Sequence, residues 1–135
     1  NKQITAIWSE AASRQKSHQA KTYVLATGGI LGGGVVTKEN GYAQDTVFGL
    51  PVAVPSQRTR WFVNEFLSSD SQPIHKNGLR VDRVLRPIDQ TDRLFYDNLY
   101  AVGGALDGFD PIREHSLEGI ALATGFSVGE ILSSM

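Results

Sequence analysis

The stretch Val24-Leu25-Ala26-Thr27-Gly28-Gly29 has a counterpart later in the chain, Tyr100-Ala101-Val102-Gly103-Gly104. Each is a short apolar run that ends abruptly in two glycines. Such runs, apolar on both faces, are typical of strands buried in the sheet of a layered α/β domain. Ligands of such sheets bind outside the carboxyl ends of the strands, where glycine lets the backbone approach a planar or phosphorylated group. Either glycine pair alone indicates a tight turn, whereas the two together favour a large ligand that touches both.

The rest of the sequence predicts an α/β fold around these runs. The two runs place strands over residues 22–26 and 98–102. The other expected elements are a strand over 3–8, a hairpin turn or longer loop within 9–21, a helix over 57–67 capped by Ser56, a strand over 78–82, and a long helix over 116–133 with a wide apolar face. Glycine costs a helix about 1 kcal/mol relative to alanine. Because Gly119, Gly125 and Gly129 recur along the last helix, we expect something to pack very close to it.

Length and composition exclude several classes of protein. A chain of 135 residues is one domain in size, and 41% hydrophobic with 20% charged residues is ordinary for a soluble globular protein. The absence of cysteine excludes disulfides, iron–sulfur ligation and a cysteine nucleophile in this chain. A net charge of −1 argues against a nucleic-acid binder. The chain begins Asn1-Lys2-Gln3 without an initiator Met or signal peptide, so we expect an excised fragment.

The segment before the last helix carries the candidates for chemistry. A helix N-terminus stabilises an anion, such as the edge of a reduced flavin, so the amides of Ser116, Leu117 and Glu118 are expected to meet one. The alternative is that Ser116 is merely the helix cap. His115, with Arg113 close by, is the candidate for acid–base work because it lies between the glycine pair and the helix.

Other motifs predict less. His18 and His75 are expected to be solvated loop residues, and no histidine shows metal-ligand spacing, so no metal site is expected. Asp107 and Asp110 are better explained as turn-forming acids than as metal ligands. The arginines between residues 80 and 93 suit a phosphorylated substrate, an acidic partner surface or a solvated surface. The G-x-G-x-x-G motif is absent, so we expect the nucleotide-binding βαβ unit to be missing.

Several motifs together resemble one known family. They are residues 26–34 (ATGGILGGG), 48–52 (FGLPV), 78–87 (GLRVDRVLRP), 98–104 (NLYAVGG) and 110–114 (DPIRE). In this order they resemble the C-terminal part of the B subunit of the anaerobic glycerol-3-phosphate dehydrogenase, which is related to the fumarate reductase and succinate dehydrogenase flavoproteins. The resemblance covers roughly residue 22 to the end.

The resemblance implies a fold and an activity. The fold is the C-terminal half of a Rossmann-like flavin-binding domain, over residues 1–135. The activity is flavin-dependent oxidation of sn-glycerol 3-phosphate to dihydroxyacetone phosphate, with FMN or FAD as cofactor and electrons passing to the quinone pool. The implied partners are the flavoprotein A subunit and the membrane-bound iron–sulfur C subunit of the same complex, at the cytoplasmic face of the inner membrane. A related flavin oxidoreductase with another substrate, and a non-catalytic assembly module, remain alternatives.

The resemblance also implies positions for the cofactor. Thr27, Gly28 and Gly29 would lie along the flavin nucleotide. Gly103, Gly104 and the start of the last helix would approach the ribityl chain and the ring. The sequence departs from the family at residues 115–119 (HSLEG), where a glycine-rich helix start is expected.

Overall fold

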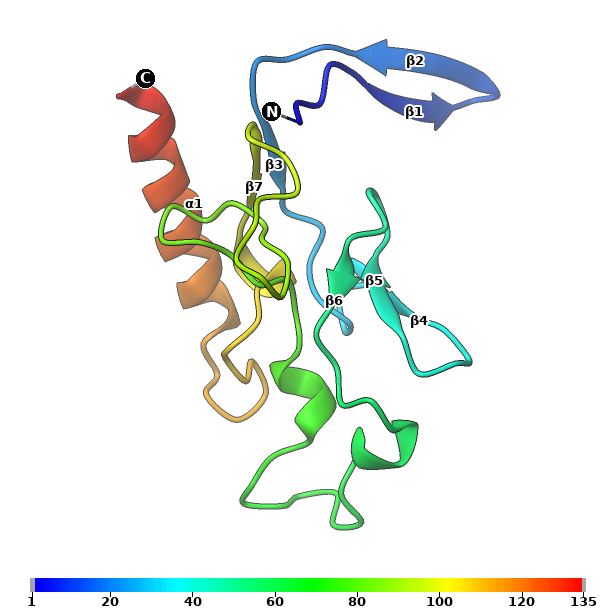
Figure 1. Ribbon diagram of the computed structural model, residues 1–135. Coiled ribbons are helices and arrows are strands. Elements are labelled where there is room, and N and C mark those ends of the chain that lie inside the picture. The colour runs from blue at the N-terminus through cyan, green and yellow to red at the C-terminus, as the bar shows by residue number, and fades with distance from the viewer. Residues whose placement is uncertain (1, 135) are drawn as a thin grey trace.

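The computed structural model describes residues 2–134 as a small α/β fold with short strands and one C-terminal α-helix (Figure 1). The strands are β1 (Ile7–Ala11), β2 (Arg14–His18), β3 (Tyr23–Leu25), β4 (Val35–Thr37), β5 (Ala43–Asp45), β6 (Pro51–Val52) and β7 (Leu99–Ala101). The 3-10 turns are η1 (Arg58–Arg60), η2 (Pro73–Lys76) and η3 (Gly103–Ala105), and helix α1 spans Leu117–Ser133. Within this described part, none of the helices has the length and apolar character needed to span a bilayer.

The two glycine-terminated runs form strands, as the sequence predicts, and the structure pairs these strands in parallel. β3 and β7 lie side by side, with Tyr23 opposite Leu99 and Leu25 opposite Ala101. β7 is buried along its whole length. The expected burial of both faces is wrong for β3, because Val24 is 46% exposed. Helix α1 packs on the β7 side of this face, through Val128 against Tyr100, and leaves Val24 uncovered.

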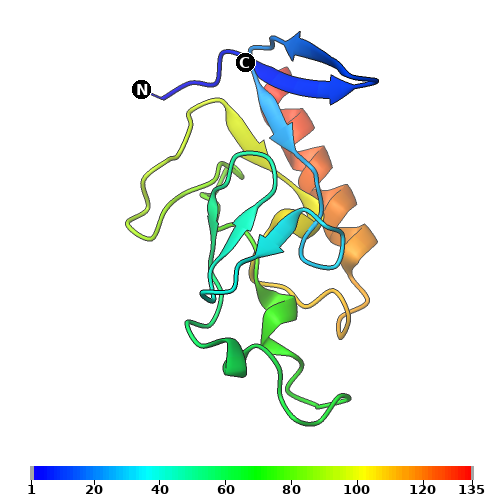
Figure 2. The same cartoon turned by 90° about the vertical axis from the view of Figure 1, so that its right-hand side faces the viewer.

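The N-terminal region forms an antiparallel hairpin. β1 pairs with β2 through a turn at Ala12 and Ser13, both of which have positive φ. The hairpin turn expected within residues 9–21 is therefore confirmed, although the strand begins at Ile7 and not at residue 3. The hairpin extends away from the rest of the molecule (Figures 1 and 2). Its base is held by the Tyr23 hydroxyl, which accepts from the Ala20 amide at 3.0 Å.

The main core lies between the β3–β7 pair and the antiparallel sheet β4-β5-β6. Leu25, Leu99 and Leu79 are among its buried members. The small sheet is ordered by Asp45, which is 1% exposed. Its carboxylate accepts the backbone amides of Val47 at 2.9 Å and Phe48 at 2.8 Å, and so it closes the turn between β5 and β6. Residues 28–32, which line one side of the cavity described below, lead into β4 of this sheet.

The helix predicted over residues 57–67 is wrong. Only η1 forms there, and the chain then runs as an irregular loop to residue 72. The buried Gln72 side chain explains the loop: its amide nitrogen donates to the carbonyls of Glu65 at 2.9 Å and Phe66 at 3.2 Å, and its oxygen accepts the Val63 amide at 2.8 Å. Backbone groups that a helix would pair internally are bound here by one side chain.

The strand predicted over residues 78–82 is also wrong. Leu79 makes an isolated parallel bridge with Leu106, and Val81 an antiparallel one with Pro87. The chain cannot continue as a strand because it reverses immediately afterwards. Asp82 accepts the amide of Arg86 at 2.9 Å, and Leu85 has a φ of 67°.

The long C-terminal helix is confirmed as α1, but its glycines do not serve close packing within residues 2–134. A Cβ placed at Gly119, Gly125 or Gly129 meets no atom within 4 Å. The expectation of a closely packed partner at these positions is therefore wrong for the described structure. The inward side of α1 contacts η3, where the Thr124 hydroxyl accepts the Gly103 amide at 2.9 Å.

Candidate functional site

The glycine ends of β3 and β7 meet at one edge of the parallel pair. A Cβ added to Gly29 would clash with the carbonyl oxygen of Gly104, and one added to Gly104 would lie 3.2 Å from the Gly29 nitrogen. The two backbones are therefore in direct contact. Both glycine pairs lie at the carboxyl ends of parallel strands, which is the edge where α/β sheets bind ligands.

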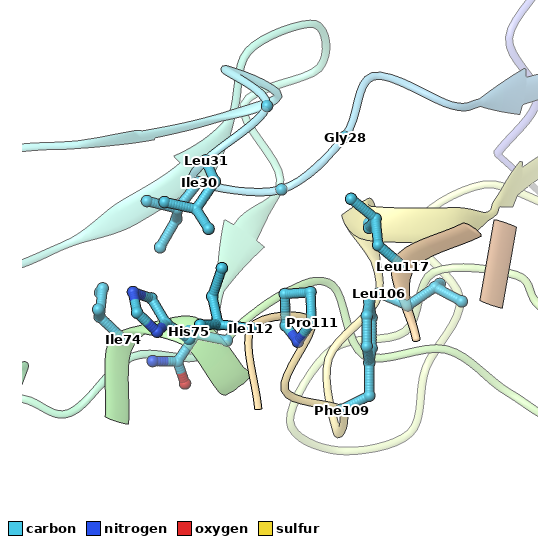
Figure 3. Close-up of a pocket in the computed structure, with 14 residues that line it drawn as sticks. Gly28, Ile30, Leu31, Ile74, His75, Leu106, Phe109, Pro111, Ile112 and Leu117 are labelled. Atoms are coloured by element: carbon cyan, nitrogen blue, oxygen red, sulfur yellow. The ribbon is translucent and has the colours of Figure 1, made fainter. Parts of the chain in front are cut away.

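A cavity of about 160 Å³ opens beside this contact and is lined by glycines of both pairs, Gly28, Gly29 and Gly104. Its walls are mainly apolar. In Figure 3, Ile30 and Leu31 lie on one side, facing His75 and Ile112 on the other. The lining residues from positions 104–117 are Gly104, Leu106, Phe109, Pro111, Ile112 and Leu117. A flat, apolar ring is the kind of group that such walls accommodate.

Four of the residues predicted to bind cofactor line this cavity. They are Gly28, Gly29, Gly104 and Leu117. The Leu117 side chain fills the space next to Gly104, since a Cβ added to Gly104 would lie 3.2 Å from the Cδ1 atom of Leu117. Leu117 and Glu118 are the two bulky residues at the helix start where the sequence analysis expects glycine-rich sequence from the family resemblance.

The other four predicted cofactor residues are not among the lining residues. Ser116 and Glu118 lie just outside, and the Ser116 hydroxyl bonds to Glu114 at 3.1 Å and makes no helix-capping bond. Gly103 faces α1, where an added Cβ would lie 3.5 Å from that of Ala121. The Thr27 hydroxyl, directly before the first glycine pair, is buried with no hydrogen-bond partner among the described residues.

The two catalytic candidates lie in different places. His115 is exposed, has a φ of 51° and does not line the cavity. Arg113 lines a second cavity of about 230 Å³, together with Phe66, Leu67 and His75. His75 and Ile112 line both cavities, so the two are neighbours.

His75 is the residue that the sequence analysis missed. It was expected in a solvated loop, but η2 holds it at the junction of the two cavities, with its amide donating to Gln72 at 3.0 Å. The sequence offered only one signal for it. Pro73 favours the first position of a helical turn, which fixes the direction of the residues that follow.

Asp110 anchors the turn that carries Ile112 and Arg113. It is 2% exposed, and its carboxylate accepts both of their amides at 3.1 Å and the hydroxyl of Ser71. Burial alone would raise the pKa of Asp110. The bond from Ser71 and the two amide bonds, aided by the nearby charge of His75, instead hold the pKa below its usual value. Asp110 is therefore a turn-forming acid, as the sequence predicts, and it stays ionised at neutral pH.

Comparison with known proteins identifies the family. A family model described as an FAD binding domain matches residues 2–121. The chain belongs to this FAD-binding domain family. It is 34% identical over 112 residues to the B subunit of the anaerobic glycerol-3-phosphate dehydrogenase of Aliivibrio fischeri (strain MJ11), an alignment that covers 83% of this chain and 24% of the relative.

Other relatives carry the same name. The B subunit of Pectobacterium atrosepticum is 35% identical over 112 residues, covering 83% of this chain and 26% of that protein. The probable B subunit of Halobacterium salinarum (strain ATCC 29341 / DSM 671 / R1) is 29% identical over 126 residues, covering 93% and 29%. The chain spans about a quarter of the length of these curated relatives. No solved structure matches it. The resemblance stated from the sequence is confirmed.

Membership of the FAD-binding domain family supports FAD, of the two flavins expected, and gives FMN no specific support. The residues present fit part of that cofactor. The cavity of about 160 Å³ is below the roughly 300–1,000 Å³ of sites that enclose a whole drug-sized ligand, so it suits part of a flavin ring and not the dinucleotide. The buried Thr27 hydroxyl and the Gly28 backbone, with its φ of 80°, lie at the same edge.

Proposed function

We propose that this chain is the flavin-facing, C-terminal part of a flavoprotein subunit that oxidises sn-glycerol 3-phosphate to dihydroxyacetone phosphate. One observation carries the proposal: in a member of the FAD-binding domain family, an apolar cavity opens where two glycine-terminated parallel strands end. The names of the relatives supply the reaction.

The residues of the cavity bind and shield the ring. Gly28, Gly29 and Gly104 bring the backbone close without side-chain bulk, and Ile30 and Leu117 exclude water from it. When bound, FAD supplies the two-electron acceptor that the oxidation of an alcohol requires.

The second cavity suits the phosphate group of the substrate. A phosphate dianion is recognised by cationic donors, and the Arg113 guanidinium is such a donor. His75 lies between this cavity and the ring cavity, so an imidazole is available both to donate to phosphate and to exchange a proton with the neighbouring hydroxyl. Ile112, shared by both cavities, separates the phosphate end from the ring end.

The finer proposals concern the whole protein. The chain is the C-terminal half of a Rossmann-like domain whose nucleotide-binding unit lies elsewhere in the sequence. It works with the flavoprotein A subunit and a membrane-bound iron–sulfur C subunit, passes electrons to the quinone pool, and lies at the cytoplasmic face of the inner membrane. The coverage of only a quarter of the relatives supports the first of these proposals, and the word "subunit" in their names supports the existence of partner subunits. The quinone pool and the membrane location rest on the family resemblance alone.

Titration of the chain with FAD, followed by amide signals in heteronuclear NMR, tests the ring site. We expect weak binding, because this cavity accommodates only part of the cofactor. The signals of Gly28, Gly29, Gly104 and Leu117 should shift, and those of the β1–β2 hairpin should not. ADP, which lacks the ring, is the control ligand and should leave the cavity signals in place. Shifts confined to other surfaces would contradict the ring site.

An assay of the intact protein with its partner subunits separates the alternatives. Turnover of glycerol 3-phosphate is expected, together with the visible absorbance of bound flavin. Turnover of a different alcohol would instead identify a related oxidoreductase. A protein without flavin of its own would favour the non-catalytic assembly module.

A further inference from the structure

Two segments far apart in the sequence build the second cavity, and one buried hydrogen bond joins them. The first segment leads through Ser71 into η2, which carries His75. The second is the turn over residues 110–115, which carries Arg113. The Ser71 hydroxyl donates to the Asp110 carboxylate across 39 positions of sequence, and both residues are buried, at 8% and 2% exposure.

Each end of this bond is connected through backbone hydrogen bonds to one residue of the second cavity, Arg113 or His75. On the Asp110 side, the carboxylate accepts the Arg113 amide at 3.1 Å, and the Asp110 carbonyl accepts the Glu114 amide at 3.0 Å. The Glu114 carboxylate in turn accepts the Asp110 amide at 3.1 Å. On the other side, Gln72 follows Ser71 directly and accepts the His75 amide at 3.0 Å. The bond therefore fixes the backbone of Arg113 relative to that of His75.

The bond between Ser71 and Asp110 is costly in free energy, which indicates that it is kept because it fixes the positions of the two segments. Ser71 holds a φ of 70°, which is uncommon for a residue other than glycine. The buried Asp110 carboxylate is surrounded by hydrogen-bond donors, and the described residues give it no ion pair. Apolar side chains of similar volume often stabilise a core as well as a buried charge does, whereas a buried carboxylate with fixed donors specifies one arrangement.

We propose that Asp110, held by Ser71, is a positioning residue that sets Arg113 and His75 at the spacing needed to bind the substrate's phosphate group. The inference rests on the proposed function, because it takes the second cavity as the phosphate site. Ser71 and Asp110 also line the second cavity, where the hydroxyl of one is bound by the carboxylate of the other. Both act through the residues that they hold.

Variants at the two ends of the bond test the proposal. Ser71→Gly removes the hydroxyl and suits the positive φ, and Asp110→Ala removes the carboxylate. Asp110→Asn is the conservative variant, since its amide oxygen still accepts the two backbone amides and its NH₂ group can donate to the Ser71 oxygen. Ser13→Gly is the matched control, because Ser13 also has a positive φ, of 60°, but lies in the distant hairpin turn.

The measurement is the affinity of the chain for inorganic phosphate, followed by the NMR signals of the His75 ring and the Arg113 guanidinium. It is made well below the thermal midpoint of every variant. A misplacement of about 1 Å can cost an enzyme up to 10²-fold in rate. By the same dependence on geometry, we expect Ser71→Gly and Asp110→Ala to weaken the affinity for phosphate roughly tenfold. Asp110→Asn should restore most of the affinity, and Ser13→Gly should leave it unchanged.

The outcomes separate this inference from the proposed function. Normal phosphate affinity in Ser71→Gly, with a lowered thermal midpoint alone, would show a purely structural bond and overturn the positioning role while leaving the phosphate site in place. If phosphate shifts neither the His75 nor the Arg113 signals of the unaltered chain, the phosphate site itself is wrong, and the positioning role fails with it.

Discussion

The backbones of Gly29 and Gly104 touch where the two parallel strands end. A side chain on Gly29 would overlap the carbonyl oxygen of Gly104. The sequence predicts glycines here to let a ligand approach. The structure shows that these two also let one strand end approach the other, and that the cavity opens beside the contact. Any side chain introduced at Gly29 therefore disturbs both the packing of the strand ends and the wall of the cavity.

The first prediction concerns this contact. Gly29→Ala should destabilise the chain by about 1–3 kcal/mol, since overpacking forces backbone shifts of that cost. Its φ is not in the left-handed range, so the loss comes from the clash and not from backbone strain. Urea unfolding followed by circular dichroism measures it. An unchanged unfolding midpoint would mean that the strand ends are further apart than described.

The second prediction concerns the helix glycines. Gly119→Ala and Gly129→Ala should each stabilise the chain by up to about 1 kcal/mol, because alanine is the better helix former and both sites open on empty space. Together they provide the matched control for Gly29→Ala. Thermal unfolding of the single and double variants checks this. A loss of stability in either single variant would indicate that α1 packs against something at that position.

The sequence predicted the parts of the fold that local pattern determines. β3, β7 and α1 come from apolar runs bounded by glycine or polar residues, and no distant contact is needed to recognise them. The helix over residues 57–67 failed because the spacing of its apolar residues was helical while its hydrogen bonds were decided elsewhere. Gln72 takes those backbone groups, and Phe66 is left 87% exposed.

The residues that line the cavities also divide into those that local sequence pattern predicts and those that it does not. Gly28, Gly29, Gly104 and Leu117 were predicted because strand ends and a helix start are visible in a sequence. The position of His75 at the junction of two cavities was not, since those cavities are built from segments that contact one another only in the folded chain, as residues 71 and 110 do. Contacts across such separations follow from tertiary packing, which no local pattern encodes.

The third prediction concerns the two tryptophans. Trp61 is 3% exposed and donates its ring N–H to the Pro55 carbonyl at 2.9 Å, whereas Trp8 on the hairpin is 67% exposed. Trp8→Phe should leave blue-shifted fluorescence that acrylamide quenches poorly. Trp61→Phe should leave red-shifted, readily quenched emission and should lose about 1 kcal/mol or more with the hydrogen bond. Equal quenching of both variants would contradict the burial of Trp61.

The last prediction concerns Asp107 and pH. Burial raises the pKa of the Asp107 carboxyl, and the charge of Arg80 and the residue's own amide offset this only in part. Because the folded state disfavours the ionised form, Asp107 costs stability above its folded pKa. That cost disappears as pH falls through the folded pKa toward the unfolded value of about 3.9. Asp107→Asn should therefore raise the thermal midpoint at pH 7, and the gain should vanish near pH 4. Asp70→Asn, at an exposed position, is the control and should change the midpoint little at either pH. A lower midpoint for Asp107→Asn at pH 7 would show that the carboxylate is stabilised by its surroundings.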